Sequence, residues 1–331
     1  MSRGELWASA ADVPASVEPS AVTIGNFDGV HLGHQAVLRQ LQDAAAARGL
    51  RPIAMTFNPH PRHVMTGSVV PPLITGYARR DDLIRDLGIS VLDLEFTRGF
   101  AQHSAEDFVR IFLVELLNAK AVVIGRDSRF GRANEGDLGT MQELGEKLGF
   151  EVLVVDELGI SASCSRVSSS VIRAAITSGD VGSAAGMLGR PHAVADVIQH
   201  GFKRGRELGF PTANFSARPD GLVPADGVYA GLLSVEVPTR ADHPDAQMRL
   251  APATISIGTN PTFEDGPLHT IVETYVHGSH DLDLYDKRVR VDFIERLRPT
   301  LAFSSIDELV VQMRQDVEVT RRTLGEWAGA R

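Results

Sequence analysis

The chain has 331 residues, of which 43% are hydrophobic and 23% are charged, as is usual for folded proteins with apolar cores. Its formal net charge of −9 argues against a general binder of nucleic acid or anionic membranes, and its single cysteine, Cys164, excludes an intrachain disulfide. The first residues lack the apolar core of a signal peptide, and no apolar run reaches the roughly 18 residues of a membrane span. We therefore expect a cytoplasmic protein of two domains, with no nucleic-acid or membrane partner.

The first half of the sequence alternates short apolar runs with amphipathic ones, at the spacing of β-α-β units. The strand-like runs cover residues 21–25, 52–57, 90–96, 121–125 and 151–157. The helix-like runs cover residues 34–49, 79–88, 104–119 and 137–149. Gly49 is expected to end the first helix and Ser104 to cap the third. The pattern predicts an α/β domain with a Rossmann-type parallel sheet and helices on its faces.

The rhythm changes near residues 185–190, beyond which strand-like runs follow one another and are separated by turn-forming residues. These runs cover residues 193–198, 227–237, 252–258, 269–276 and 288–294. An antiparallel sheet closed into a small barrel is the natural expectation, and an amphipathic run at 304–327 predicts a C-terminal helix that covers it. We expect an α/β domain over residues 1–186 and an all-β domain over residues 187–331.

The stretch GNFDGVHLGH, residues 25–34, follows the first predicted strand and precedes the first predicted helix. A helix start offers free backbone N–H groups to an anion, and glycines let the backbone approach it closely. His31 and His34 suit three uses: a metal pair, capping and packing of the helix, or phosphate handling. No further ligand with convincing spacing lies nearby, and the glycines and helix start favour phosphate.

A second helix start, SRVSSSVIRAA at residues 165–175, places hydroxyls between two arginines. The serines could simply cap the helix. Hydroxyls and guanidinium groups at a helix start also form a phosphate site, so the sheet is expected to carry two anion-binding helix starts.

These two stretches together resemble the HxGH and ISSTxIR motifs of the adenylyltransferase module in bacterial bifunctional riboflavin kinase/FAD synthetases. TFNPHP, residues 56–61, and GRDSRFG, residues 125–131, fall where that family has two further signatures. The resemblance implies a nucleotidyltransferase-like domain that transfers AMP from ATP to FMN, giving FAD and pyrophosphate, with Mg²⁺ bridging the phosphates. It implies catalytic roles for His31, His34, Ser169, Ser170 and Arg173. It implies ATP or flavin binding by Gly25, Asn26, Phe27, Asp28, Gly29, Asn58, His60, Pro61, Asp127 and Arg166.

GFKRGRELGFPTANF, residues 201–215, combines glycines with cations and matches neither a Walker A loop nor a dinucleotide fingerprint. Taken alone it could be a basic hairpin turn. Pro211 fixes a turn that presents Thr212 and Asn214 as neighbouring hard-oxygen groups of the kind that suit Mg²⁺.

The stretch is similar to the RGRxLGFPTAN signature of riboflavin kinases, and SIGTNPTF at 256–263 and VETY at 272–275 agree with that family. The resemblance implies a six-stranded barrel with a C-terminal helix, and phosphorylation of riboflavin by Mg²⁺–ATP with Glu273 as general base. Thr212 and Asn214 would hold the metal. ATP or flavin binding is implied for Gly201, Lys203, Gly205, Arg206 and Asn260.

The two resemblances together imply one chain that converts riboflavin to FMN and then FMN to FAD. The alternative is a riboflavin kinase whose first domain acts on another acceptor or is inactive. Arg126 and Ser128 stand where the family usually has apolar or aromatic residues, and this departure bears on the acceptor rather than on the chemistry.

Overall fold

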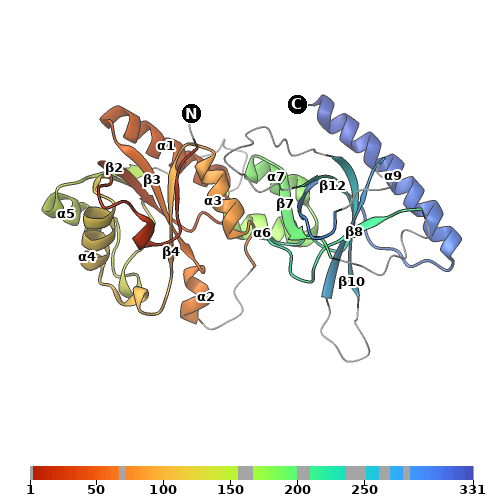
Figure 1. The fold of residues 1–331 in the computed structure, drawn as a ribbon, viewed down its shortest axis with the longest axis horizontal. Helices are drawn as coiled ribbons and strands as arrows, with labels where there is room; N and C mark the ends of the chain where they lie inside the picture. The colour runs from red at the N-terminus through yellow and green to blue at the C-terminus, as the bar shows by residue number, and fades with distance from the viewer. Residues whose placement is uncertain are drawn as a thin grey trace. The chain divides into compact units, whose positions relative to one another are not determined.

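The computed structural model describes residues 3–66, 72–155, 167–199, 209–235, 251–260, 269–278 and 284–330, with the main chain alone at Thr66, Asn260 and His269. The chain divides into two compact units. The first comprises residues 1–72 and 76–168, and the second comprises residues 73–75 and 169–331 (Figure 1). The short segment Leu73–Thr75 belongs to the second unit: Ile74 is fully buried, and its carbonyl oxygen accepts a hydrogen bond from the Leu222 N–H.

The first unit is built on a parallel sheet of six strands in the order β1-β4-β3-β2-β5-β6. The strands are β1 (Leu6–Trp7), β2 (Ser20–Ile24), β3 (Arg51–Asn58), β4 (Ser90–Glu95), β5 (Ala119–Gly125) and β6 (Glu151–Val155). Each neighbouring pair is parallel. The predicted Rossmann-type sheet is therefore confirmed, with one additional edge strand, β1, whose two residues are too few to show a pattern.

Helices cover both faces of this sheet (Figure 1). Alternate strand residues serve the two faces, as the pleat requires. On one face, Val91 and Val123 pack with Leu38 of α1 and Ile84 of α3. The opposite face packs against α5 and the segment that starts with α4. These helices are α1 (Leu32–Arg48), α3 (Tyr77–Arg85), α4 (Ala105–Phe108) and α5 (Leu138–Leu148).

The local signals for helix ends act as expected. Gly49 ends α1 with a φ of 64°, a left-handed conformation that glycine adopts without strain. The Ser104 hydroxyl accepts a hydrogen bond from the Asp107 N–H and donates one to the Asp107 carboxylate. The continuous helix predicted over 104–119 is wrong in two respects, because Val109–Leu116 is π-helical and Ala119 already belongs to β5. Apolar spacing marks the buried face but does not distinguish these two helical pitches.

Some short elements escaped the sequence analysis. They are α2 (Pro61–Thr66), α7 (Val181–Leu188), β8 (Thr212–Asn214) and the 3₁₀ turns at Ala10–Asp12, Phe100–Gln102 and Arg132–Asn134. Each has fewer than nine residues, so a hydrophobic period has little room to repeat.

The second unit contains an antiparallel sheet in the order β7-β12-β9-β10-β11-β8. The other strands are β7 (His192–Val197), β9 (Gly227–Val235), β10 (Ala251–Asn260), β11 (His269–Val276) and β12 (Arg288–Arg298). The sheet curls, because an antiparallel bridge joins Gln199, just after β7, to Asn214 in β8 at the other edge. Its interior is filled by buried side chains such as Tyr229, Ile255 and Phe293. The predicted six-stranded barrel is confirmed.

Two helices lead into this sheet and one covers it: α6 (Ser169–Ser178), α7 and α9 (Ile306–Gly329). The predicted C-terminal helix is α9, which contacts β9, β10 and β12. A two-bond ion pair fastens α9 to the sheet, since Arg298 donates to Asp316 over 2.9 and 2.7 Å. Both side chains are largely buried.

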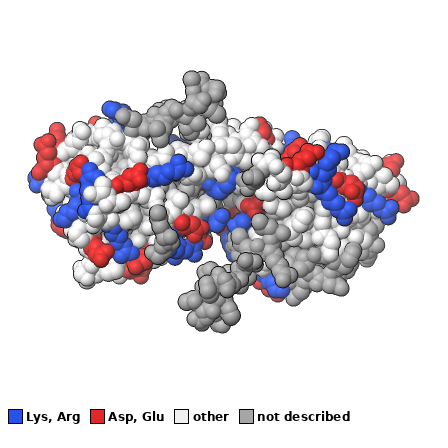
Figure 2. All heavy atoms as spheres, turned by 90° about the horizontal axis from the view of Figure 1, so that it is seen from above, with Lys and Arg blue, Asp and Glu red and all other residues white. Residues whose placement is uncertain are grey.

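On the face drawn in Figure 2, acidic and basic side chains lie interspersed in small groups. In the part of the chain that the structure describes, no helix has the length and apolarity needed to cross a membrane.

We expect Asp316→Ala to destabilise the second unit by about 3 kcal/mol, because it leaves the Arg298 guanidinium buried without its carboxylate. Urea unfolding followed by Trp327 fluorescence, in a W7F background, measures the change. Glu318→Ala removes an exposed ion pair from the same helix and is the control, with an expected loss below about 1 kcal/mol. Equal losses in the two variants would contradict the assignment.

Candidate active sites

The carboxyl ends of β3, β2 and β5 lie side by side in the first sheet. The chain leaves β2 toward β3 on one side, and β5 lies on its other side, so the strand order reverses at β2. Ligands of open α/β sheets bind in the crevice at such a reversal. Parts of three predicted stretches lie at this edge: residues 25–29 of the stretch 25–34 after β2, residues 58–61 of the stretch 56–61 at the end of β3, and Asp127 of the stretch 125–131 after β5.

The loop after β2 has an unusual main chain. Phe27, Gly29 and Val30 adopt φ angles of 49°, 85° and 40°. A left-handed conformation is rare for a β-branched residue such as Val30 and costs free energy. Two hydrogen bonds hold the loop, from the Val30 N–H to the Phe27 carbonyl and from the Gln35 side chain to the Val30 carbonyl. Strain that is held in this way is typical of ligand-binding loops.

His31 and His34 lie at the start of α1, with their rings stacked at a centroid distance of 3.6 Å. His31 caps the helix, because its Nδ1 accepts a hydrogen bond from the His34 N–H over 3.3 Å. In the neutral ring an accepting Nδ1 places the proton on Nε2, so the cap leaves a donor for another partner. The capping reading is therefore correct for His31 and compatible with phosphate binding. Among the described residues, no group of three metal-ligating side chains is present.

Two polar residues of the same loop are withdrawn from solvent. Asp28 is buried, and Asn26 has a buried side-chain oxygen that has no hydrogen-bond partner within the described parts of the chain. The Asn26 main chain is attached to β3, since its carbonyl accepts from the Thr56 hydroxyl over 3.5 Å. A buried, unsatisfied acceptor is uncommon in proteins and marks Asn26 as a candidate ligand group.

Asn58, the last residue of β3, is exposed, and His60 is half-buried. The His60 N–H donates to the Tyr77 hydroxyl over 2.7 Å, and the His60 ring accepts from the Arg62 N–H over 3.2 Å. Asp127 is exposed at the end of β5. The sequence analysis missed Tyr77, since a single tyrosine at a helix start carries no motif.

Ser169, Ser170 and Arg173 occupy the first turns of α6, as predicted, and α6 belongs to the second unit. Val167, two residues before α6, lies near Gly33 at the start of α1. Its carbonyl oxygen is 4.0 Å from the place that the Cβ of a side chain at position 33 would take. Arg166 lies outside the described residues.

In the second unit, the pairing of β8, β11 and β10 places polar residues next to one another. Glu273 of β11 is directly opposite Asn214 of β8 on one side and Ser256 of β10 on the other. Directly opposite residues of an antiparallel pair project from the same face, about 5 Å apart at Cβ. Thr212 lies two residues before Asn214 and therefore shares this face. The sequence analysis did not single out Ser256, although it begins a stretch that was quoted for its resemblance.

The environment of Glu273 favours a role as a base. Its side chain reaches solvent, and its strand neighbours Val272 and Thr274 are buried. The protein packed around it partly desolvates its carboxyl and raises the pKa above the ordinary glutamate value. A carboxylate with a raised pKa accepts a proton more readily.

Four predicted residues of the basic loop, Gly201, Lys203, Gly205 and Arg206, lie outside the described residues. Gln199, the last described residue before them, is hydrogen-bonded to Asn214, because its N–H donates to the Asn214 carbonyl over 3.0 Å. Asn260 pairs with His269 through the main chain at the ends of β10 and β11.

The first unit carries a glycine- and histidine-rich loop at the carboxyl edge of a parallel sheet, and the second carries a glutamate opposite an asparagine. Both arrangements suit an enzyme that transfers phosphate groups, with a candidate site in each unit. The family model for FAD synthetase matches residues 13–171, and the one for riboflavin kinase matches residues 188–324. Bifunctional riboflavin kinase/FMN adenylyltransferases from Listeria monocytogenes and Escherichia coli K12 are 34% and 33% identical to this chain. These matches cover 91% of each chain for the Listeria protein, and 94% of this chain and 95% of the other for the Escherichia coli protein. The chain belongs to the family of bifunctional riboflavin kinase/FMN adenylyltransferases.

A solved structure titled as a macrolide-efflux protein from Streptococcus pneumoniae has the same two-part architecture. Its TM-score to this chain is 0.80 at 29% identity, and the match covers 96% of this chain and 98% of the other. The family-model bounds leave residues 172–187, which include most of α6 and α7, between the two matches. The domain boundary between residues 186 and 187 stays a prediction.

Proposed function

We propose that the chain carries out two consecutive reactions: phosphorylation of riboflavin by ATP in the second unit, and adenylyl transfer from ATP to FMN in the first. The observation that supports this most strongly is the presence of one candidate site in each unit. Residues after β2, β3 and β5 gather in the first unit, and a glutamate lies opposite an asparagine in the second. Each unit is also matched by its own family model.

In the proposed adenylyl transfer, a phosphate oxygen of FMN attacks the α-phosphorus of ATP. The bond from that phosphorus to the bridging oxygen breaks, and pyrophosphate leaves. No protein nucleophile is needed, so the protein's work is to align two anions and to stabilise charge. The free N–H groups at the start of α1, with His31 and His34, supply donors. By resemblance, Ser169, Ser170, Arg173 and Arg166 hold the leaving phosphates.

In the proposed kinase reaction, Glu273 takes the proton from the 5′-hydroxyl of riboflavin. The resulting oxygen attacks the γ-phosphorus of ATP, and ADP leaves. The row formed by Ser256, Glu273 and Asn214 places a base beside amide and hydroxyl groups on one face. Positioning and charge neutralisation dominate such reactions, so a glutamate is an adequate base.

The residues proposed to hold Mg²⁺ fit a hard cation. Thr212 and Asn214 offer a hydroxyl and an amide oxygen from the same face of β8. The Asn214 side-chain NH₂ donates to the Thr212 carbonyl over 3.4 Å, which turns the amide oxygen away from that carbonyl. When bound, Mg²⁺ neutralises charge on the phosphate oxygens of ATP.

We expect purified protein given riboflavin, ATP and Mg²⁺ to form FMN first and FAD afterwards, as resolved by chromatography of the flavins. FMN without FAD would leave a riboflavin kinase whose first unit uses another acceptor or is inactive. Formation of neither product would overturn the proposal.

We expect His31→Asn to separate helix capping from phosphate handling. Asparagine is a good N-cap, so the free energy of unfolding should change by less than about 1 kcal/mol. Loss of the imidazole donor should slow FAD formation from FMN by about 100-fold and leave the kinase rate unchanged. Steady-state kinetics of both half-reactions and thermal unfolding measure these effects, with His63→Asn on the exposed face of α2 as control. FAD formation at the wild-type rate would show that His31 caps α1 and does not act on the phosphates.

We expect Glu273→Gln to lower the kinase rate by about 100-fold or more while FAD formation from FMN is retained. Because the base must be ionised, the wild-type kinase rate should fall as the pH drops through the raised pKa of Glu273. The variant should lack this acidic limb. Glu295→Gln, an exposed glutamate of β12, is the control and should keep the wild-type profile. An acidic limb that persists in Glu273→Gln would exclude Glu273 as the base.

A further inference from the structure

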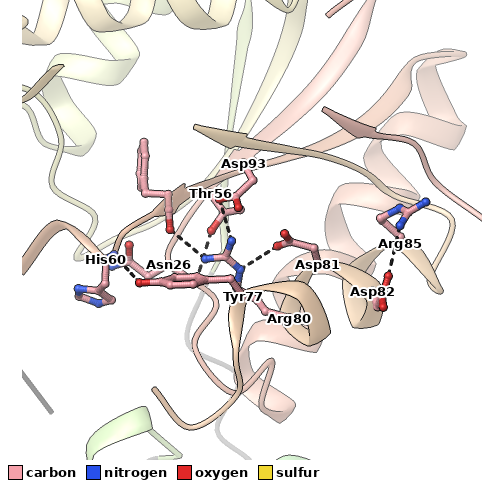
Figure 3. A network of polar contacts seen from close by, with 10 residues as sticks. Asn26, Thr56, His60, Tyr77, Arg80, Asp81, Asp82, Arg85 and Asp93 are labelled. Atoms are coloured by element: carbon pink, nitrogen blue, oxygen red, sulfur yellow. Dashed lines mark hydrogen bonds and ion pairs between the residues drawn. The ribbon is translucent and has the colours of Figure 1, made fainter. Parts of the chain in front are cut away.

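A buried ionic cluster lies beneath the end of β3 in the first unit (Figure 3). Arg80 of α3 is 2% exposed, and its guanidinium donates to Asp81 over 2.9 Å and to Asp93 of β4 over 2.8 Å. Its remaining terminal nitrogen donates to the Phe57 carbonyl oxygen over 3.0 Å. The sequence analysis predicted a helix over residues 79–88, which includes Arg80, but no motif marks this residue.

The cluster is costly as a packing device. One guanidinium shares its buried site with two carboxylates, so burial and the charge of Asp93 raise the pKa of Asp81 to about 6, while Arg80 opposes this shift. Apolar side chains attach helices to sheets without such a cost, and Ile84 of the same helix packs against the sheet in this way. The contact of Arg80 that apolar packing could not replace is the directed hydrogen bond to the Phe57 carbonyl.

Tyr77 forms a second attachment one turn earlier on α3. Its ring lies under the Arg80 guanidinium, with the guanidinium carbon 5.0 Å from the ring centroid. Its hydroxyl accepts the hydrogen bond from the His60 N–H. Burial raises the pKa of this hydroxyl, which therefore stays protonated. Arg80 and Tyr77 thus hold the main chain on both sides of Asn58 and Pro59, and Pro59 itself has no N–H to donate.

We propose that Arg80 is a positioning residue for adenylyl transfer, which holds the main chain from Phe57 to His60 so that Asn58 and His60 meet the bound substrates at the carboxyl edge of the sheet. This inference rests on the proposed function of the first unit. Arg80 acts through this segment and touches no substrate itself.

A neighbouring ion pair provides a matched control. Arg85 lies on the same helix and donates to Asp82 over 3.2 Å and to the Gly4 carbonyl over 2.9 Å. Among the described residues its hydrogen bonds and ion pair go to Gly4 and Asp82 rather than to residues 57–60, and Figure 3 shows the pair with Asp82 apart from the Arg80 cluster. Arg85→Met therefore removes a guanidinium from α3 while the attachment of residues 57–60 stays intact.

Three variants test the proposal: Arg80→Met, Arg80→Lys and Tyr77→Phe. We expect Arg80→Met to lower kcat/KM for FAD formation from FMN by about 10- to 100-fold, because small displacements of substrate-contacting groups have effects of that size. Arg80→Lys keeps the buried positive charge but not the forked geometry, so it should fold well and still lose activity. Tyr77→Phe removes only the hydroxyl and should give a smaller loss. Arg85→Met should stay within about twofold of the wild type, since surface ion pairs contribute little.

Two further readouts separate positioning from stability. Riboflavin phosphorylation by the second unit should be unchanged in every variant and reports the concentration of active protein. Hydrogen exchange at the His60 amide should be faster in Arg80→Lys and Tyr77→Phe than in Arg85→Met, with or without activity.

Wild-type kcat/KM in folded Arg80→Lys and Tyr77→Phe would overturn the positioning role, and so would an equal loss in Arg85→Met. Absence of FAD formation by the wild-type protein would instead refute the proposed function of the first unit. In that case, unchanged exchange at the His60 amide would also overturn the attachment of this segment by Arg80 and Tyr77.

Discussion

The parallel pairing of β2 with both β3 and β5 is the constraint on which the first unit depends. Parallel strands end at the same edge, so the segments that follow these three strands meet although they are far apart in sequence. Three locally unfavourable features also lie at or beneath this edge. Val30 has a left-handed main chain, Asn26 has an unsatisfied buried oxygen, and Arg80 is buried with two carboxylates close by. Such costs at one place are expected where the local structure serves ligand binding.

In the second unit, antiparallel strand register brings the candidate site residues together. Its sheet is antiparallel, and strand register brings Glu273 next to Asn214 and Ser256 on one face. The opposite face of the same strands is largely apolar, as the buried Val272 and Ile255 show. A shift of one residue in this register would turn Glu273 into the core and Val272 out of it, so the hydrophobic pattern and the site stabilise the same register.

The sequence predicted the long elements well because their apolar runs repeat over enough residues to show a period. It failed where the element is short, as for β1 and β8, or where two structures share one pattern, as for the π-helical Val109–Leu116. The candidate site was predictable where chemistry concentrates in one stretch. It was not predictable where the contribution comes from tertiary packing, because Arg80 and Tyr77 acquire their partners only when α3 lies against β3 and β4.

The central claim is that one chain holds two distinct ATP sites, one for each of the two proposed reactions. The number of molecules of a non-hydrolysable ATP analogue bound per chain, measured by equilibrium dialysis in the presence of Mg²⁺, tests it most directly. Two analogue molecules per chain are predicted, with only one remaining in a variant in which either site is disabled. A single bound molecule per wild-type chain at saturation would contradict the claim.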